Sequence, residues 1–196
     1  TRGMSSAASD VYKRQDFGPS NWSNKVEKFG AVVIGARKIL VAYNVNVDEI
    51  DATASKKAGS LVRSSGRLLK SNDGKRTRIP GMLEMVQGMG LPLEAHNISQ
   101  VSMNLRDVSK TPMHIAYEAV RSIVNDHGVE TCGSELVGLV PLSAMLDSGR
   151  WYAPEGCEDE AELVEAAIKG LGLSSLSAFK PKERIIEWAL NQEEIK

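Results

Sequence analysis

The side chains that most often carry acid–base or nucleophilic chemistry are few and scattered in this sequence. Its three histidines are His96, His114 and His127. We expect His96 in a hairpin turn, His114 on the polar face of a helix's first turn, and His127 at a helix C-terminus, where a positive ring suits the dipole. The HExxH, GxSxG and P-loop motifs are absent, and no GxGxxG follows a strand. The sequence therefore assigns no catalytic residue.

The cysteines and the paired carboxylates predict no metal centre. Cys132 and Cys157 lie far apart, without a CxxC pattern and without a neighbouring histidine. We expect two idle thiols rather than a redox or metal site. Asp159 and Glu160 open a helix, where acidic side chains suit the positive end of the dipole, and we expect both to be solvated.

Short uncharged polar groups recur at alternate positions of two predicted strands. Gln100, Ser102 and Asn104 share one face of one strand, and Asn44 and Asn46 share one face of the other. A face that met only water would more usually carry Lys, Glu and Thr. Any one of these side chains is explained by hydrogen bonds to backbone groups, but together they favour a docking face for a ligand.

Two further features adjoin this polar set. Arg37 interrupts an apolar strand, which costs packing unless its charge finds a partner, either a substrate carboxylate or a structural ion pair. The loop before that strand carries Phe17, Trp22 and Phe29. Its rings either pin the loop to the core or stack on a ligand, and polar groups beside an aromatic loop suit a flat conjugated molecule with polar edges.

Composition limits the class of protein. The chain has 196 residues, of which 42% are hydrophobic and 25% charged, with a net charge of −1. This is globular composition for one domain with a small appendage, and it excludes intrinsic disorder and a small disulfide scaffold. The sequence has no apolar run long enough to span a membrane, and its near-neutral charge disfavours a nucleic-acid partner.

The first segment, residues 1–15, carries no helical or strand period and no apolar signal region. We interpret it as a non-native, adapter-like tail, which leaves residues 16–196 as the domain. Hydrophobic periodicity and turn residues predict the elements of that domain. They are a loop over 16–30, a strand over 31–47, a helix over 49–67, a polar loop over 70–78, strands over 82–91 and 98–107, a helix from Thr111-Pro112 to Gly128, a strand over 129–133, and helices over 141–147, 158–171 and 181–191.

The order of these elements predicts the fold class. Strand, helix, strand, strand, helix, strand is the split β-α-β pattern of a ferredoxin-like α+β sandwich, here followed by extra C-terminal helices. In such a sandwich both helices cover one face of the sheet. The other face, which carries the polar set, is left for a ligand or for another domain.

Several segments together resemble the glutamate formimidoyltransferases. The resemblance runs in family order from Asp16 to about Leu190 and matches the C-terminal subdomain of the transferase. Its segments are Asp16-Phe17-Gly18-Pro19-Ser20, Gly35-Ala36-Arg37-Lys38, Ala42-Tyr43-Asn44-Val45-Asn46, Gln100-Val101-Ser102-Met103-Asn104-Leu105, Thr111-Pro112-Met113-His114, Gly133-Ser134-Glu135-Leu136-Val137-Gly138-Leu139-Val140-Pro141 and Phe179-Lys180-Pro181-Lys182-Glu183-Arg184-Ile185-Ile186-Glu187. The family's Gly-Trp-Tyr turn reads Gly88-Met89-Gly90 here, which is a local departure.

The resemblance implies a cytoplasmic enzyme of histidine degradation that moves a formimidoyl group from N-formimidoyl-glutamate to tetrahydrofolate, its co-substrate. It also implies that the catalytic histidine belongs to an N-terminal subdomain that this chain lacks, so the chain alone is expected to be inactive. The family's folate-contacting segment corresponds here to Gly18, Pro19, Ser20, Asn21, Trp22, Phe29 and Gly30. The substrate-facing candidates are Arg37, Asn44, Asn46, Gln100, Ser102 and Asn104.

Two alternatives stay open from the sequence. One is a non-catalytic ferredoxin-like module that binds a ligand or docks on a partner. The other is a folate-dependent formyltransferase of the same fold, because the reacting centre would lie mostly outside this chain. A homodimer is also left open.

Overall fold

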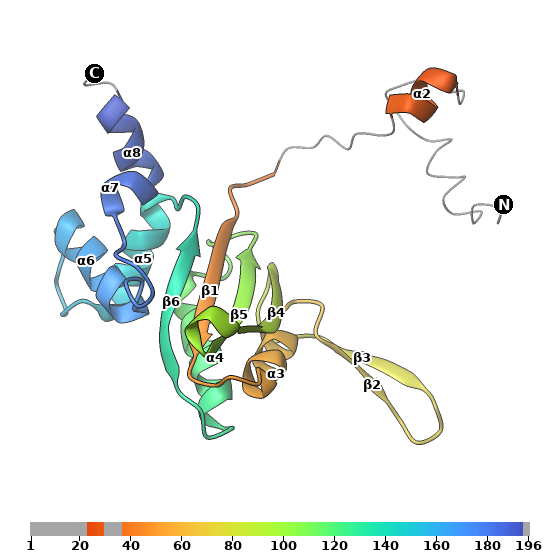
Figure 1. The fold of residues 1–196 in the computed structure, drawn as a ribbon. Coiled ribbons are helices and arrows are strands. Elements are labelled where there is room, and N and C mark those ends of the chain that lie inside the picture. The colour runs from red at the N-terminus through yellow and green to blue at the C-terminus, as the bar shows by residue number, and fades with distance from the viewer. Residues whose placement is uncertain (1–22, 30–36, 194–196) are drawn as a thin grey trace. The chain divides into compact units, whose positions relative to one another are not determined.

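The computed structural model describes residues 23–29 and 37–193 (Figure 1). The chain divides into two compact units, Thr1–Ala36 and Arg37–Lys196. Within the first unit the described element is a short helix, α2 (Asn24–Phe29). A loop was predicted there, and that prediction is wrong for these residues: the Glu27 amide donates to the Ser23 carbonyl at 2.9 Å. Lysine and glutamate are good helix formers, which explains the turn.

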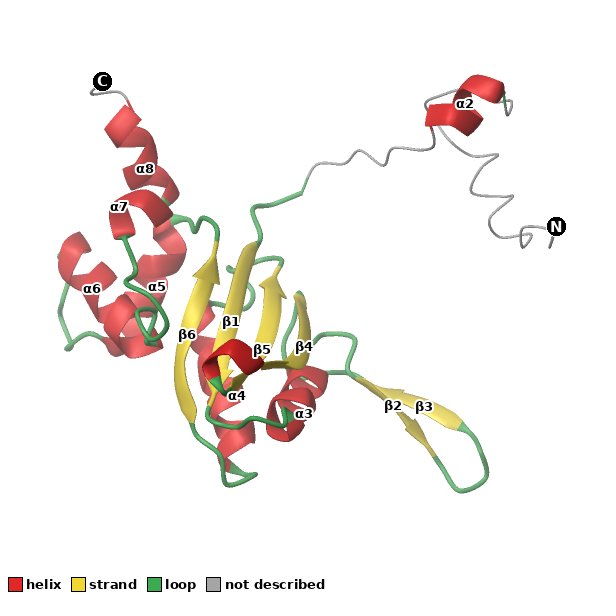
Figure 2. Ribbon diagram, viewed as in Figure 1, coloured by secondary structure: helices red, strands yellow, loops and turns green. Residues whose placement is uncertain are grey.

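The second unit is built on a four-stranded antiparallel sheet (Figure 2). Its strands are β1 (Val41–Val47), β4 (Val86–Leu93), β5 (Ile98–Leu105) and β6 (Thr131–Val137), in the spatial order β4-β5-β1-β6. Helix α3 (Thr53–Val62) follows β1 in the chain, and α4 (Met113–Asn125) connects β5 to β6. The predicted α+β class is confirmed, and these four strands and two helices follow one another in the predicted chain order.

The core lies between one face of the sheet and the helices α3 and α4. Alternate residues of β1 and β5 point into it, because side chains on a strand alternate between the two faces. The buried side chains that these four elements contribute to one cluster include Val41, Tyr43, Val45, Val47, Ala58, Val62, Val101, Met103, Leu105, Val120 and Val124. The residues between them on each strand point to the other face of the sheet, which carries the polar residues.

The helices beyond the sheet are α5 (Leu142–Tyr152), α6 (Glu160–Leu171), α7 (Pro181–Arg184) and α8 (Ile186–Glu193). Helices α5 and α6 pack closely where Gly149 meets Leu163, since a Cβ at Gly149 would lie 2.2 Å from the Leu163 carbonyl oxygen. The single helix predicted over 181–191 is two helices, because Ile185 leaves helical geometry with ψ 121°. None of the helices in the described ranges is long and apolar enough to cross a membrane.

The segment predicted as a polar loop over 70–78 belongs instead to a β-hairpin. Strands β2 (Arg67–Lys70) and β3 (Arg76–Ile79) pair with each other and extend away from the main sheet as a ribbon (Figure 1). The two strands are joined by a turn at Asn72-Asp73-Gly74, with Gly74 at φ 83°. The strands escape a pattern search because they are short, charged and exposed on both faces.

Three element boundaries differ from prediction for physical reasons. The strand predicted over 31–47 begins at Val41, and its residues 31–36 lie outside the described part. Ile39, inside the predicted strand, is 57% exposed in irregular backbone. The helix predicted over 49–67 is the shorter α3, and Ile50 is 66% exposed. The strand predicted over 129–133 continues to Val137, because Gly133 at φ 109° bends it without ending it.

The start of α4 also corrects the sequence reading. The helix predicted to open at Thr111-Pro112 begins at Met113. Pro112 is its N-cap residue, and the Thr111 hydroxyl donates to the Glu84 carbonyl at 2.7 Å. His114, predicted on the polar face of the helix's first turn, is only 8% exposed, while the neighbouring Ile115 is 37% exposed. His114 therefore does not lie on a polar, solvated face.

Candidate functional site

The polar residues predicted on two strand faces do lie on one face of the sheet. The register pairs Asn44 with Ser102 and Asn46 with Gln100 across β1 and β5. On β4, Gln87 pairs with Asn104. Amide and hydroxyl groups from neighbouring strands are thus brought together over the middle of the sheet, as the sequence predicted for β1 and β5.

At one end of this face the polar groups are buried and bonded to each other. Asn46 is fully buried and Gln100 is 4% exposed. The Gln100 Nε2 donates to Asn46 Oδ1 at 2.8 Å and to Glu135 Oε2 at 3.3 Å. Asn46 in turn donates from Nδ2 to the Ser175 Oγ at 3.0 Å. The side chains of Asn46 and Gln100 are therefore hydrogen-bonded to other protein groups. These bonds hold Glu135 and Ser175 in place beside the face.

Glu135 joins this face from β6, where it pairs with Asn44 of β1. It is the one charged residue in the four strands of the sheet, and its side chain is half-buried. Sequence analysis missed it as a face residue because the predicted strand ended at Gly133. The alternation from Ser134 to Val137 was the signal that could have placed it there.

The other end of the face is open to a ligand. Asn44, Ser102 and Asn104 are half-buried. Ser102 and Asn104 line a depression of about 290 Å³ together with Gln87 and Met89 of β4 and Arg63 at the end of α3. Met89 is 60% exposed. The depression thus offers an amide, a hydroxyl, a cation and an apolar thioether, a set that suits a molecule with both ring and polar edges.

Arg37 does not interrupt the strand as predicted. It lies in irregular backbone before β1 and is exposed, so its charge needs no protein partner. The neighbouring Lys38 makes the local ion pair instead, with its Nζ 2.7 Å from Asp107 Oδ2. The hydrogen bonds from Lys38 and Ser109 lower the pKa of Asp107 to about 2.

The predicted folate-contacting segment falls almost entirely outside the described residues. Phe29 is the last residue of α2. The others that lie outside the described part are Gly18, Pro19, Ser20, Asn21, Trp22 and Gly30. The aromatic stacking predicted for this segment stays a prediction.

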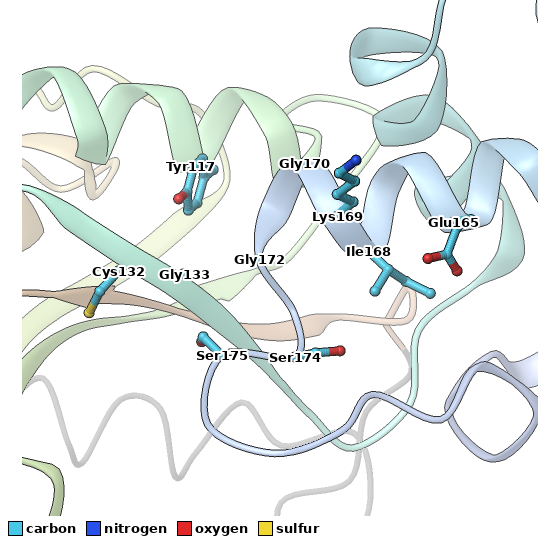
Figure 3. A pocket seen from close by; sticks show the side chains of 10 residues that line it. All are labelled: Tyr117, Cys132, Gly133, Glu165, Ile168, Lys169, Gly170, Gly172, Ser174 and Ser175. Carbon is cyan, nitrogen blue, oxygen red and sulfur yellow. The ribbon is translucent and has the colours of Figure 1, made fainter.

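A second depression, of about 490 Å³, lies between β6 and α6 (Figure 3). Cys132 and Gly133 line it from β6, Glu165 and Lys169 from α6, and Ser175 from the segment that follows. The Ser175 hydroxyl is already bonded to Asn46.

Cys132 and Cys157 are both free thiols, and burial raises the pKa of each, which disfavours the reactive thiolate.

His114 is the one histidine with a distinctive setting among the described residues. Its ring stacks on Trp151, with centroids 5.1 Å apart and an interplanar angle of 18°. Burial lowers the pKa of His114, although the nearby Asp147 and Glu118 oppose the shift. Its Nδ1 is buried without a hydrogen-bond partner. His96 and His127 are exposed, as expected.

A protein family described as the formiminotransferase domain matches residues 42–191, from β1 into α8. The chain belongs to this family. The match includes every residue of the polar sheet face, and it confirms the resemblance inferred from the sequence motifs.

Individual relatives of the formiminotransferase family agree. The chain is 42% identical over 176 residues to a formimidoyltransferase-cyclodeaminase of Rattus norvegicus, covering 88% of this chain and 30% of the relative. It is 37% identical over 156 residues to a glutamate formimidoyltransferase of Thermoplasma acidophilum, covering 80% of this chain and 46% of the relative. The chain thus spans less than half the length of these two relatives.

Proposed function

We propose that this chain is the C-terminal, substrate-aligning half of a glutamate formimidoyltransferase, the enzyme that moves a formimidoyl group from N-formimidoyl-glutamate to tetrahydrofolate in histidine degradation. The observation that carries the proposal is the polar sheet face. A chain of the formiminotransferase family places Asn44, Ser102 and Asn104 side by side, half-buried, next to an open depression. Both relatives named above carry formimidoyltransferase in their names.

We assign the fold to the ferredoxin-like sandwich. Support comes from the spatial order β4-β5-β1-β6 of a fully antiparallel sheet. Apart from the β2-β3 hairpin inserted before β4, the chain order is β1, α3, β4, β5, α4, β6, with two crossover helices. Because α3 and α4 share the apolar core with one face, the opposite face is the natural place for a second subdomain to approach.

Within this proposal the face has two kinds of residue. Asn44, Ser102 and Asn104 contact the substrates, because short uncharged groups can pair with amide and carboxylate edges at little desolvation cost. Asn46 and Gln100 are positioning residues, since both are buried and their side chains are bonded to protein groups. Arg37 is exposed and is assigned as a clamp for a substrate carboxylate.

Folate binding by residues 18–30 is part of the proposal and rests on the resemblance alone. Trp22 or Phe29 would stack on a ring of tetrahydrofolate, and such contacts contribute about 0.5–1.5 kcal/mol beyond area burial. Trp22→Ala in the complete transferase tests this through the dissociation constant for tetrahydrofolate, which should rise several-fold. An unchanged constant in a folded variant rejects the assignment.

We assign no catalytic residue to this chain. Amidine transfer passes through a tetrahedral centre, so it needs a proton shuttle and two aligned substrates. His114, the histidine with the lowered pKa, is buried against Trp151 and belongs to α4, on the apolar side of the sheet. In this proposal the remaining length of the transferase supplies the acid–base group, and this chain alone does not turn over.

The experiment is a double change on the face, Ser102→Lys with Asn104→Glu, in the complete transferase. The longer charged side chains obstruct the depression while leaving the apolar face untouched, so activity and affinity for both substrates should fall. The matched control is Thr77→Lys with Asn72→Glu on the exposed hairpin, which adds the same charges elsewhere. If activity and affinity survive the first change, the face is ordinary surface and the proposal fails.

A further inference from the structure

Glu135 is an isolated charge among the residues of the four sheet strands. The four strands of the sheet contain no other charged residue. Within the described part of the chain, none of the ion pairs involves it. A half-buried carboxylate without a cation loses part of its hydration and gains no Coulomb energy in return, which is unfavourable in a resting protein.

The carboxylate is held in a defined place on the face. Gln100 Nε2 donates to Glu135 Oε2 at 3.3 Å, and Gln100 is itself fixed by Asn46 at 2.8 Å. Across the sheet, Glu135 pairs with Asn44, which in turn pairs with Ser102. An ionised carboxylate has about four acceptor sites, so one hydrogen bond from Gln100 leaves most of its capacity for a ligand.

The formimidoyl group has the chemistry that such a carboxylate recognises. An N-substituted formamidine is protonated at neutral pH and is then a planar cation with N–H donors on both nitrogens. It presents to a carboxylate the same kind of fork as a guanidinium, and such pairs are short and roughly twice as strong as neutral hydrogen bonds. A formyl amide is neutral, and its carbonyl oxygen is an acceptor that a carboxylate repels.

We propose that the Glu135 carboxylate pairs with the amidinium of N-formimidoyl-glutamate and makes the site select a formimidoyl over a formyl donor. This inference rests on the proposed function and deepens it. This pairing would decide which of the two one-carbon groups, formimidoyl or formyl, the enzyme carries, a choice that the sequence leaves open. Asn44 and Ser102, the next residues along the face, would then flank the reacting group.

The test is Glu135→Gln in the complete transferase, with N-formimidoyl-glutamate and N-formyl-glutamate as alternative donors. Glutamine keeps the shape and one acceptor but removes the charge. The KM for N-formimidoyl-glutamate should rise about tenfold or more, since hydrogen bonds to charged groups are the strong ones. The preference for the formimidoyl donor, as the ratio of kcat/KM values, should fall by a similar factor. The charge-matched control is Glu155→Gln, an exposed position in the segment between α5 and α6, which should change neither the KM nor the donor preference.

A second variant and a second readout separate the outcomes. Glu135→Asp keeps the charge and should retain the formimidoyl preference even if its geometry weakens binding. The dissociation constant for tetrahydrofolate should be the same in wild type and in Glu135→Gln. If wild type binds tetrahydrofolate and turns over while Glu135→Gln keeps its donor preference, this inference is wrong. If wild type binds neither tetrahydrofolate nor either donor, the proposed function itself is wrong.

Discussion

The side-chain amide of Gln100 on β5 donates to the side-chain carbonyl of Asn46 on β1 at 2.8 Å, and both residues are buried. Asn46 also donates to Ser175 in the segment after α6, at 3.0 Å. This pair therefore ties the central strands of the sheet to a segment far along the chain. It fixes the closed end of the polar face, while the end near Ser102 stays open.

Asn46→Ala should destabilise the protein by about 1–3 kcal/mol, because it leaves the buried Gln100 amide and the Ser175 hydroxyl each short of a partner. Urea unfolding followed by circular dichroism measures the free energy of unfolding. Asn44→Ala is the matched control on the same strand and face. Within the described ranges no side-chain hydrogen bond involves Asn44, so its change should stay within about 0.5 kcal/mol. Equal losses in the two variants would show that the network contributes nothing.

Glu49 caps the start of α3 and should make stability depend on pH. Its carboxylate accepts from the amides of Ala54 and Ser55 at 2.9 and 2.7 Å, and from the Ser99 hydroxyl at 2.9 Å. Partial burial raises the pKa of Glu49, but these hydrogen bonds outweigh burial and hold the pKa below its ordinary value. The stabilisation is thus fully present above the ordinary glutamate pKa, and it is lost as the pH falls through the lowered one.

Glu49→Gln should therefore lower the free energy of unfolding by about 1–2 kcal/mol at neutral pH. The difference in the free energy of unfolding between wild type and variant should narrow as the pH falls below the ordinary glutamate pKa. Glu84→Gln, at an exposed position, is the control. Its free energy of unfolding should change with pH in the same way as that of wild type. A gap that is constant across the acid range would contradict the capping role.

Two glycines on the same face of β4 should differ in how much stability an alanine costs. A Cβ at Gly90 would lie 2.1 Å from the Lys56 amide nitrogen of α3, which is backbone and cannot give way. At Gly88 the nearest atom would be 3.4 Å away, an ordinary contact. Gly90→Ala should cost at least about 2 kcal/mol by overpacking, whereas Gly88→Ala should stay within about 1 kcal/mol. Thermal unfolding compares them, and similar melting temperatures would refute this packing.

The stack of His114 on Trp151 should be visible in the titration of the histidine. Burial lowers the pKa of His114, so the unfolded chain takes up the proton more readily and stability falls as the pH drops below about 6.5. Trp151→Ala exposes the ring and should raise the pKa of His114 toward its ordinary value, which an NMR titration of the ring protons measures. Trp188→Ala, an indole on α8, is the control and should leave His114 unchanged. An unaltered pKa in Trp151→Ala would mean that Trp151 does not shield the ring.

The sequence predicted the elements that obey one clear period. On β5, Val101, Met103 and Leu105 are buried and alternate with polar residues, as predicted. The hairpin of β2 and β3 escaped prediction, because Leu68 and Leu69 are 49% and 41% exposed and no buried face sets a pattern. The start of β1 was placed too early because an apolar run continues upstream of Val41, and composition alone does not show where pairing begins.

The candidate site was predictable in part. Polar alternation placed Asn44, Asn46, Gln100, Ser102 and Asn104 on strand faces, and the strand register confirms that they adjoin. Whether their side chains are already hydrogen-bonded to protein groups depends on Ser175 and Glu135. These two residues come from distant segments of the chain. No local pattern connects residues so far apart in sequence. Glu135 lies on the polar face because β6 continues past Gly133 to Val137.

The measurement that bears most directly on the polar sheet face is substrate protection of a thiol placed on it. Ser102→Cys in the complete transferase is labelled with a thiol reagent, and the rate at that cysteine is read by peptide mass spectrometry. Saturating tetrahydrofolate and N-formimidoyl-glutamate should slow labelling at position 102 by several-fold and leave Thr77→Cys, on the exposed hairpin, unaffected. If the enzyme binds both substrates and position 102 is labelled at the same rate with and without them, the face is not where substrates bind.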